Sequence, residues 1–188
     1  TIQDIERVGK YLDGKGILFL VDAAQSAGVL EIDMERMKID ILCLTGHKHL
    51  LAPQGVGALL IKDTVEIDTL IEGGTGSFSD EIQPNIFPDK LESGTLNAPA
   101  ISALGKSIEF INKVGIKNIR KKDEELISYF IENMKKLDGV EIYNFNILKT
   151  SSVVSINIKD YQSSDIEDYL SNEYNIITRS GLHCAPMV

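Results

Sequence analysis

The sequence has few cysteines and no long apolar segment. Its two cysteines, Cys43 and Cys184, lie far apart and define no disulfide framework. This usage fits the reducing environment of the cytoplasm, where we expect the protein to reside. No apolar run approaches the roughly 20 residues that a membrane-spanning helix needs. The sequence therefore indicates a cytoplasmic protein with no membrane partner.

Positive charge is also scarce. The chain has 19 Lys and Arg against 28 Asp and Glu, a net charge of -9. Nonspecific binding to nucleic acid or to anionic membranes depends on clustered Lys and Arg, so we expect neither partner. The glycine-rich segment 73–79 lacks the Gly-Lys-Ser/Thr ending of a nucleotide-binding P-loop, which argues against ATP binding. No segment that we recognise as a metal site is present.

The chain has enough apolar residues, 43% of 188, to bury a core. We expect an α/β fold with a mainly parallel sheet and helices over residues 1–114, followed by a small α+β domain over 115–188. Continuous apolar runs predict the buried strands of that sheet at 17–21, 39–44 and 56–61. Apolar spacing predicts helices after Thr1 and at 32–37, 98–112, 117–137 and 164–174, and further strands at 140–143, 153–158 and 176–178.

Two charged residues follow neighbouring predicted strands. Asp22 closes the run 17–21, and Lys48 follows the run 39–44. Ligands of open α/β sheets bind outside the carboxyl ends of the strands, so this carboxylate and this amine can meet at one ligand. Pyridoxal phosphate needs both groups: its aldehyde reacts with a lysine, and a carboxylate keeps its ring nitrogen protonated. Either residue alone would be typical of a solvated strand end.

The sequence around these residues resembles the class V aminotransferases, most closely the cysteine desulfurase and selenocysteine lyase group. The resemblance is carried by residues 21–28 (VDAAQSAG) and 44–59 (LTGHKHLLAPQGVGAL). It implies pyridoxal phosphate as cofactor and the fold of a PLP-dependent transferase. The implied roles are cofactor attachment and proton transfer for Lys48, and cofactor contacts for Asp22 (ring nitrogen), Gln25 (ring phenolate), and Thr45 and His47 (phosphate). On local chemistry alone, Gln25 and Thr45 are equally well explained as polar turn residues.

A second segment, residues 178–186 (TRSGLHCAP), resembles the part of cysteine desulfurases with a short active-site loop that carries the sulfur-accepting cysteine. The resemblance implies that Cys184 attacks the substrate sulfur and becomes a persulfide. Gly181 and Pro186 indicate a loop, and His183 would favour the reactive thiolate. A lone cysteine is more often a small buried residue, and Cys43, inside an apolar strand, is interpreted in that way. Arg179 is interpreted as structural or as a neighbour of the cysteine.

Residues 90–100 (KLESGTLNAPA) resemble the family block whose threonine contacts the cofactor phosphate of the partner subunit. Thr95 is therefore a candidate ligand across a homodimer. Local chemistry alone offers another role, because Thr95 could cap the helix that begins at Ala98, although Asn97 is better placed for this.

The implied activity is that of a cysteine desulfurase, which converts L-cysteine to alanine and delivers the sulfur to an acceptor protein. The chain begins with Thr1 inside a helical pattern, so we expect it to be the C-terminal part of such a protein and to stop shortly before its end. One alternative is a selenocysteine lyase, or another β-lyase or aminotransferase of the same fold. The other is a noncatalytic piece that folds or dimerises without cofactor.

Overall fold

The computed structural model describes residues 1–77, 82–143 and 150–183, which form two compact units. The first unit contains Asp4–Arg120. The second contains Thr1–Gln3 and the described residues from Lys121 onward. Helix α3 (Ile116–Met134) contributes to both units.

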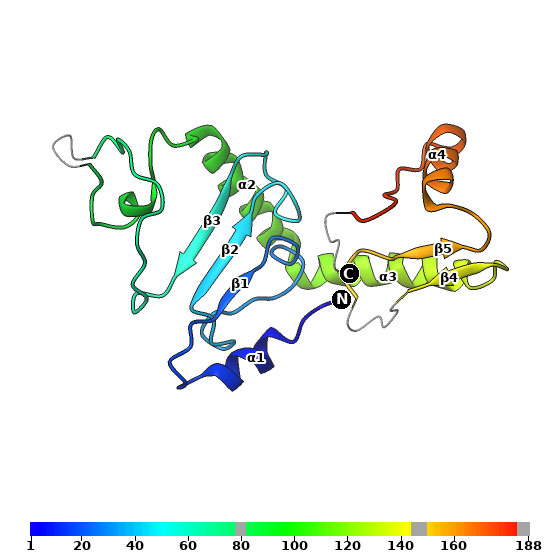
Figure 1. Cartoon of the computed structure of the whole chain (residues 1–188), viewed down its shortest axis with the longest axis horizontal. Helices are drawn as coiled ribbons and strands as arrows, with labels where there is room; N and C mark the ends of the chain where they lie inside the picture. The colour runs from blue at the N-terminus through cyan, green and yellow to red at the C-terminus, as the bar shows by residue number, and fades with distance from the viewer. Residues whose placement is uncertain (78–81, 144–149, 184–188) are drawn as a thin grey trace. The chain divides into compact units, whose positions relative to one another are not determined.

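The first unit is built on a three-stranded sheet, shown in cyan and blue in Figure 1. Its strands are β1 (Leu20–Asp22), β2 (Ile41–Thr45) and β3 (Gly57–Ile61), in that spatial order. Strand β2 pairs in parallel with β1 and antiparallel with β3. All three predicted strands are confirmed, but the prediction of a mainly parallel sheet is wrong for β3. A parallel pairing needs a long crossover, usually a helix, and residues 46–56 contain none.

Two helices of this unit have the side-chain caps that helix starts favour. Asp4 accepts a hydrogen bond from the Arg7 amide (3.2 Å) at the start of α1 (Ile5–Leu12). Asn97 accepts one from the Ala100 amide (3.3 Å) at the start of α2 (Ala98–Val114), which confirms the preferred cap. A short 3-10 helix, η1 (Asp89–Leu91), precedes α2.

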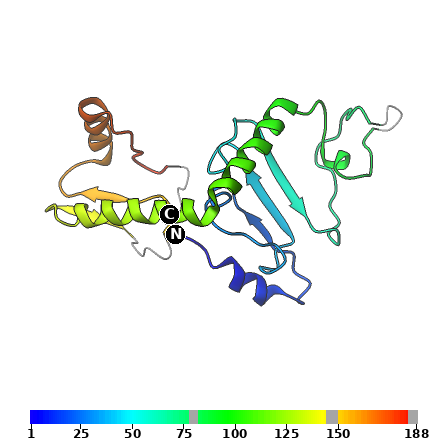
Figure 2. The same cartoon turned by 180° about the vertical axis from the view of Figure 1, so that it is seen from behind.

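Helix α2 lies across one face of the sheet, as the front and back views agree (Figures 1 and 2). Its buried Leu104 and Ile111 share one apolar cluster with Val21 of β1 and Leu42 of β2. Burial of such side chains is the main favourable term in holding the layers together. The helix therefore supports β1 and β2, the two strands that carry the predicted site residues.

Strand β3 differs from its expected burial. Leu59 and Leu60 are 45% and 41% exposed, and Leu20 of β1 is 54% exposed. Strands β1 and β3 are the outer strands of the described sheet, so each has only one strand neighbour. The prediction of fully buried strands is thus correct for Val21 of β1 and for Ile41 and Leu42 of β2. It is wrong for β3 and for Leu20 of β1.

The second unit contains most of α3, a two-stranded antiparallel sheet of β4 (Val140–Ile142) and β5 (Ile156–Ile158), and helix α4 (Ser163–Tyr174). All four elements were predicted from the sequence. The predicted strand at 176–178 is wrong, because no strand of the described residues pairs with it and Ile177 is 81% exposed. No described helix is both long and apolar enough to cross a membrane.

The predicted helix at 32–37 is also wrong, since this segment forms turns. Asp33 accepts hydrogen bonds from the Arg36 amide through its side chain and from the Met37 amide through its carbonyl, both at 2.9 Å. Lys38 then adopts a left-handed conformation (φ 58°), which ends the turn. One turn closed by an Asp side chain is too short to propagate as a helix.

Candidate functional site at the carboxyl edge of the sheet

Asp22 lies at the carboxyl end of β1, directly opposite Cys43 of β2. It is exposed, and its Oδ1 accepts a hydrogen bond from the Ala24 amide (2.9 Å). The Ala23 amide continues the ladder to the Cys43 carbonyl (2.9 Å). One carboxylate oxygen is thus used to hold the turn, while Oδ2 accepts no hydrogen bond from the described residues.

Lys48 lies in the tight turn that follows β2. The turn is closed by hydrogen bonds from the Gly46 amide to the Val56 carbonyl (2.8 Å) and from the Leu51 amide to the Lys48 carbonyl (2.9 Å). Lys48 is half-buried, and within the described ranges its amine has no hydrogen bond or ion pair. Because β1 and β2 are parallel, the turn of Lys48 and the turn of Asp22 follow the same edge of the sheet.

Thr45 and His47 form a polar pair on this turn. The Thr45 hydroxyl and His47 Nδ1 lie 3.1 Å apart, and His47 is exposed. A hydroxyl and an imidazole that are held together and open to solvent can both contact an anionic oxygen. Gln25 is exposed on the turn after Asp22. Four predicted cofactor residues and Lys48 thus come from two neighbouring turns.

Two glycines that were not predicted as site residues hold these turns close to other backbone. Gly28 has a φ of 93°, and a Cβ there would lie 2.5 Å from the His49 carbonyl oxygen. A Cβ at Gly46 would lie 2.7 Å from Cγ1 and 2.9 Å from the carbonyl of Val56. Both glycines fall in the matched motifs, and their positions within tight turns were the available signal. Any side chain at Gly28 would force apart the two segments that carry Asp22 and Lys48.

His49 is the other residue that sequence reasoning missed. Its Nδ1 is buried and makes no hydrogen bond to any described residue. Buried polar nitrogens without partners are rare in folded proteins. The side chain follows Lys48 directly, so this unsatisfied atom belongs to the same turn.

Thr95 is exposed in the loop before α2. The loop comes near the Lys48 segment, since Asn97 Nδ2 lies 3.7 Å from the position of a Cβ on Gly55. Ser107 of α2 donates a hydrogen bond to the Leu51 carbonyl (3.1 Å). The loop with Thr95 therefore lies at the same end of this unit as the Lys48 turn. Cys184 lies outside the described residues.

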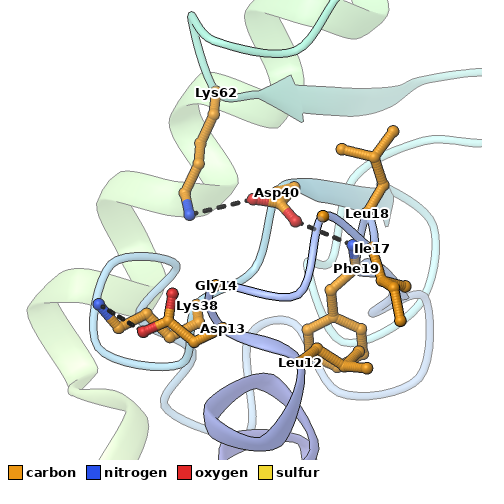
Figure 3. Close-up of a pocket in the computed structure, with 10 residues that line it drawn as sticks. Leu12, Asp13, Gly14, Ile17, Leu18, Phe19, Lys38, Asp40 and Lys62 are labelled. Atoms are coloured by element: carbon orange, nitrogen blue, oxygen red, sulfur yellow. Dashed lines mark hydrogen bonds and ion pairs between the residues drawn. The ribbon is translucent and has the colours of Figure 1, made fainter.

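A cavity of about 280 Å³ lies at the opposite edge of the sheet (Figure 3). Its walls include Asp40, which precedes β2, and Lys62, which follows β3. Lys62 Nζ donates to Asp40 Oδ1 (3.2 Å), and the Phe19 amide donates to Asp40 Oδ2 (2.9 Å). The Phe19 amide, together with Lys62, holds the pKa of the Asp40 carboxyl below its ordinary value. None of the predicted site residues lines this cavity.

The whole chain, residues 1–188, matches the family model described as aminotransferase class-V. The chain therefore belongs to this family. Its strand-end carboxylate and the lysine in the turn after the next strand lie within the matched residues.

Its relatives are cysteine desulfurases. The chain is 34% identical to a "Probable cysteine desulfurase" of Methanothermobacter thermautotrophicus and 33% identical to one of Pyrococcus abyssi, covering 98% of this chain and 47% of each relative. A crystal structure of a cysteine desulfurase from Escherichia coli superposes with a TM-score of 0.86 at 25% identity, over 98% of this chain and 46% of that one. The chain thus spans about half the length of the relatives that it matches.

Proposed function

We propose that this chain belongs to a PLP-dependent cysteine desulfurase, which takes sulfur from L-cysteine, releases alanine and holds the sulfur as a persulfide on Cys184. The observation that carries the proposal is the pair formed by Asp22 and Lys48 on neighbouring turns at one edge of the sheet, with groups that the fold leaves available. The names of the relatives favour sulfur chemistry over transamination.

The chemistry of these side chains fits pyridoxal phosphate. Within the described residues, one Asp22 carboxylate oxygen and the Lys48 amine make no hydrogen bond, so the first suits the ring nitrogen and the second the aldehyde. The pair Thr45 and His47 suits the phosphate. Gln25 and Thr95 are the further proposed contacts, to the ring phenolate and to the phosphate of a partner subunit's cofactor. When bound, the cofactor supplies an electron sink for the substrate α-carbon.

The protein's own groups move the protons. Lys48 would hold the cofactor through Nζ and, as a free amine, would take the proton from the substrate α-carbon. Asp22, through its charge, keeps the ring nitrogen protonated. The hydrogen bond from Ala24 fixes the Asp22 carboxylate in position for this contact.

Cys184 performs the sulfur step. Its thiolate attacks the substrate sulfur, the new S–S bond forms, and the bond between sulfur and the substrate β-carbon breaks. The electron pair stays with the three-carbon product, which takes up a proton and leaves as alanine. The balance is one L-cysteine and one enzyme thiol giving one alanine and one enzyme persulfide, so no external oxidant is needed. An acceptor protein with a thiol would then take the terminal sulfur. We also propose that the enzyme works as a homodimer.

The test is Cys184→Ser in the holoenzyme, incubated with L-cysteine. We expect mass spectrometry to find one extra sulfur on the wild-type peptide that contains Cys184 and none on the variant, because a hydroxyl is a poor nucleophile and cannot hold a persulfide. Cofactor absorbance should be equal in the two proteins. If the variant releases alanine and sulfide at the wild-type rate, Cys184 is dispensable and a lyase reaction is correct. If the protein takes up no cofactor at all, the alternative of a noncatalytic piece is correct.

A further inference from the structure

The chain reverses direction at the end of α4. Asn175 adopts a left-handed conformation (φ 54°), and its amide and that of Ile176 donate to the carbonyls of Ser171 (3.2 Å) and Leu170 (3.0 Å). This arrangement satisfies the last carbonyls of a helix and turns the chain back. The following residues therefore return toward the first half of α4, where Ser180 meets Glu167.

Glu167 holds Ser180 by two hydrogen bonds. Its Oε2 accepts from the Ser180 amide (3.0 Å) and from the Ser180 hydroxyl. The hydroxyl bond, the amide bond and the nearby charges of Arg179 and His183 lower the pKa of Glu167. The carboxylate is therefore charged at neutral pH, and hydrogen bonds to a charged acceptor are the stronger kind.

This contact lies immediately before the segment with the proposed nucleophile. In the same segment, residues 176–178 form no strand within the described part of the chain, and residues 181–183 are exposed. Ser180 is half-buried, and it is four positions before Cys184 in the sequence. A nucleophile works only when it is held near the atom that it attacks, so a fixed point shortly before Cys184 in the sequence bears on its reaction.

We infer that Glu167 is a positioning residue, whose carboxylate anchors Ser180 so that the chain enters the Cys184 segment from a fixed point on α4. The inference rests on the proposed function of Cys184. It adds a residue on a different element, outside the sequence motifs that carry the family resemblance. The expected effect is on the sulfur step, because Ser180 lies four positions before the proposed nucleophile of that step in the sequence.

The test compares Glu167→Ala, Glu167→Gln and Ser180→Ala in the holoenzyme with Asp168→Ala as the matched control. Asp168 is the next residue on α4, is exposed, and makes no hydrogen bond or ion pair within the described ranges. Persulfide formation on Cys184 is followed in a single turnover with saturating L-cysteine. We expect about a 10- to 100-fold slower rate for Glu167→Ala, with the KM for L-cysteine unchanged. Glu167→Gln keeps an acceptor oxygen and Ser180→Ala keeps the amide donor, so both should lose less.

Amide hydrogen exchange of the peptide that contains Ser180 tests the anchor independently of sulfur chemistry. Exchange should be faster in Glu167→Ala than in the wild type and unchanged in Asp168→Ala. Equal exchange in all of them would overturn the anchor. Faster exchange with wild-type persulfide formation, or an equal loss of rate in Asp168→Ala, would overturn the positioning role. Absence of persulfide in the wild type would instead contradict the proposed function.

Discussion

The two edges of the three-stranded sheet each carry an aspartate and a lysine, and they use them differently. At the cavity edge both Asp40 oxygens accept hydrogen bonds, from Lys62 and from the Phe19 amide. At the carboxyl edge Asp22 uses one oxygen for the Ala24 amide, and the Lys48 amine has no partner in the described part of the chain.

The difference shows which pair has a structural role. A half-buried carboxylate and amine that satisfy one another stabilise the fold and leave nothing for a ligand. An aspartate and a lysine with no ion pair in the described part of the chain add no such stabilisation, and both groups remain available to a ligand. The charged pair at the cavity edge is thus satisfied within the fold, while the groups at the carboxyl edge are those that we propose to bind a ligand.

The largest difference between the two edges is expected when each lysine is replaced in turn. Lys48→Ala should lower kcat/KM for alanine formation from L-cysteine at least about 10³-fold, because it loses both the amine that attaches the cofactor and the proton carrier. Lys62→Ala should keep activity and lose stability. Activity assays, visible absorbance of the cofactor and thermal unfolding separate the two outcomes.

Lys48→Arg is expected to fail as completely as Lys48→Ala, since a guanidinium stays protonated and cannot attach the cofactor. Near-normal turnover in either Lys48 variant would contradict the assigned role.

The second comparison exchanges each aspartate for asparagine. Asp22→Asn should keep the hydrogen bond from the Ala24 amide, and hence the turn, but lose the charge that holds the ring proton. We expect cofactor to remain bound and α-proton exchange into deuterated water to slow by about 10² to 10³-fold, the usual scale for one electrostatic contact. Asp40→Asn serves as the control and should exchange at the wild-type rate. Equal rates in Asp22→Asn and the wild type would refute the carboxylate's role.

The sequence predicted the elements that carry the site because their signals are local. Continuous apolar runs marked β1, β2 and β3, and helical spacing with Asn97 as cap marked α2. The errors come from interactions between segments. The direction of β3 depends on what the connection 46–56 contains. The segment 176–178 is β-branched but has no strand beside it among the residues that the structure describes.

The site residues themselves were found from a motif, whereas the partners of each charged group were not. Residue type alone does not distinguish Asp22, which closes one predicted strand, from Asp40, which lies near the start of the next. Only the tertiary structure shows that Asp40 meets Lys62 across β2 and β3, and that Glu167 meets Ser180. Pairing of charged side chains over such separations depends on the assembled fold, which local propensity does not encode.

A third prediction concerns the stability supplied by the satisfied pair. Asp40→Ala removes the acceptor of the Phe19 amide and leaves the half-buried Lys62 amine without its carboxylate. We expect the free energy of unfolding to fall by about 2 kcal/mol, the scale of hydrogen bonds to a charged group. Urea unfolding measures the change. Asp63→Ala is the control, because Asp63 is exposed beside Lys62 and makes no contact of this kind with the described residues. A loss as large in Asp63→Ala would show that Asp40 has no special role.

The smallest expected effect is the pH dependence of the same pair. The hydrogen bond from the Phe19 amide, followed by Lys62, lowers the pKa of Asp40 from its ordinary value of 3.8. A carboxyl whose folded pKa is depressed stabilises the protein above its unfolded pKa, and this contribution is lost as the pH falls through the folded pKa.

The difference in unfolding free energy between the wild type and Asp40→Asn should therefore stay constant from pH 7 to about pH 5 and shrink below about pH 4. Its change should stay under about 1 kcal/mol, because both side chains of the pair reach solvent. Urea unfolding at each pH measures it, with Asp22→Asn as the comparison from the open edge. A difference that grows on acidification would mean that Asp40 is not held in its charged form by the fold.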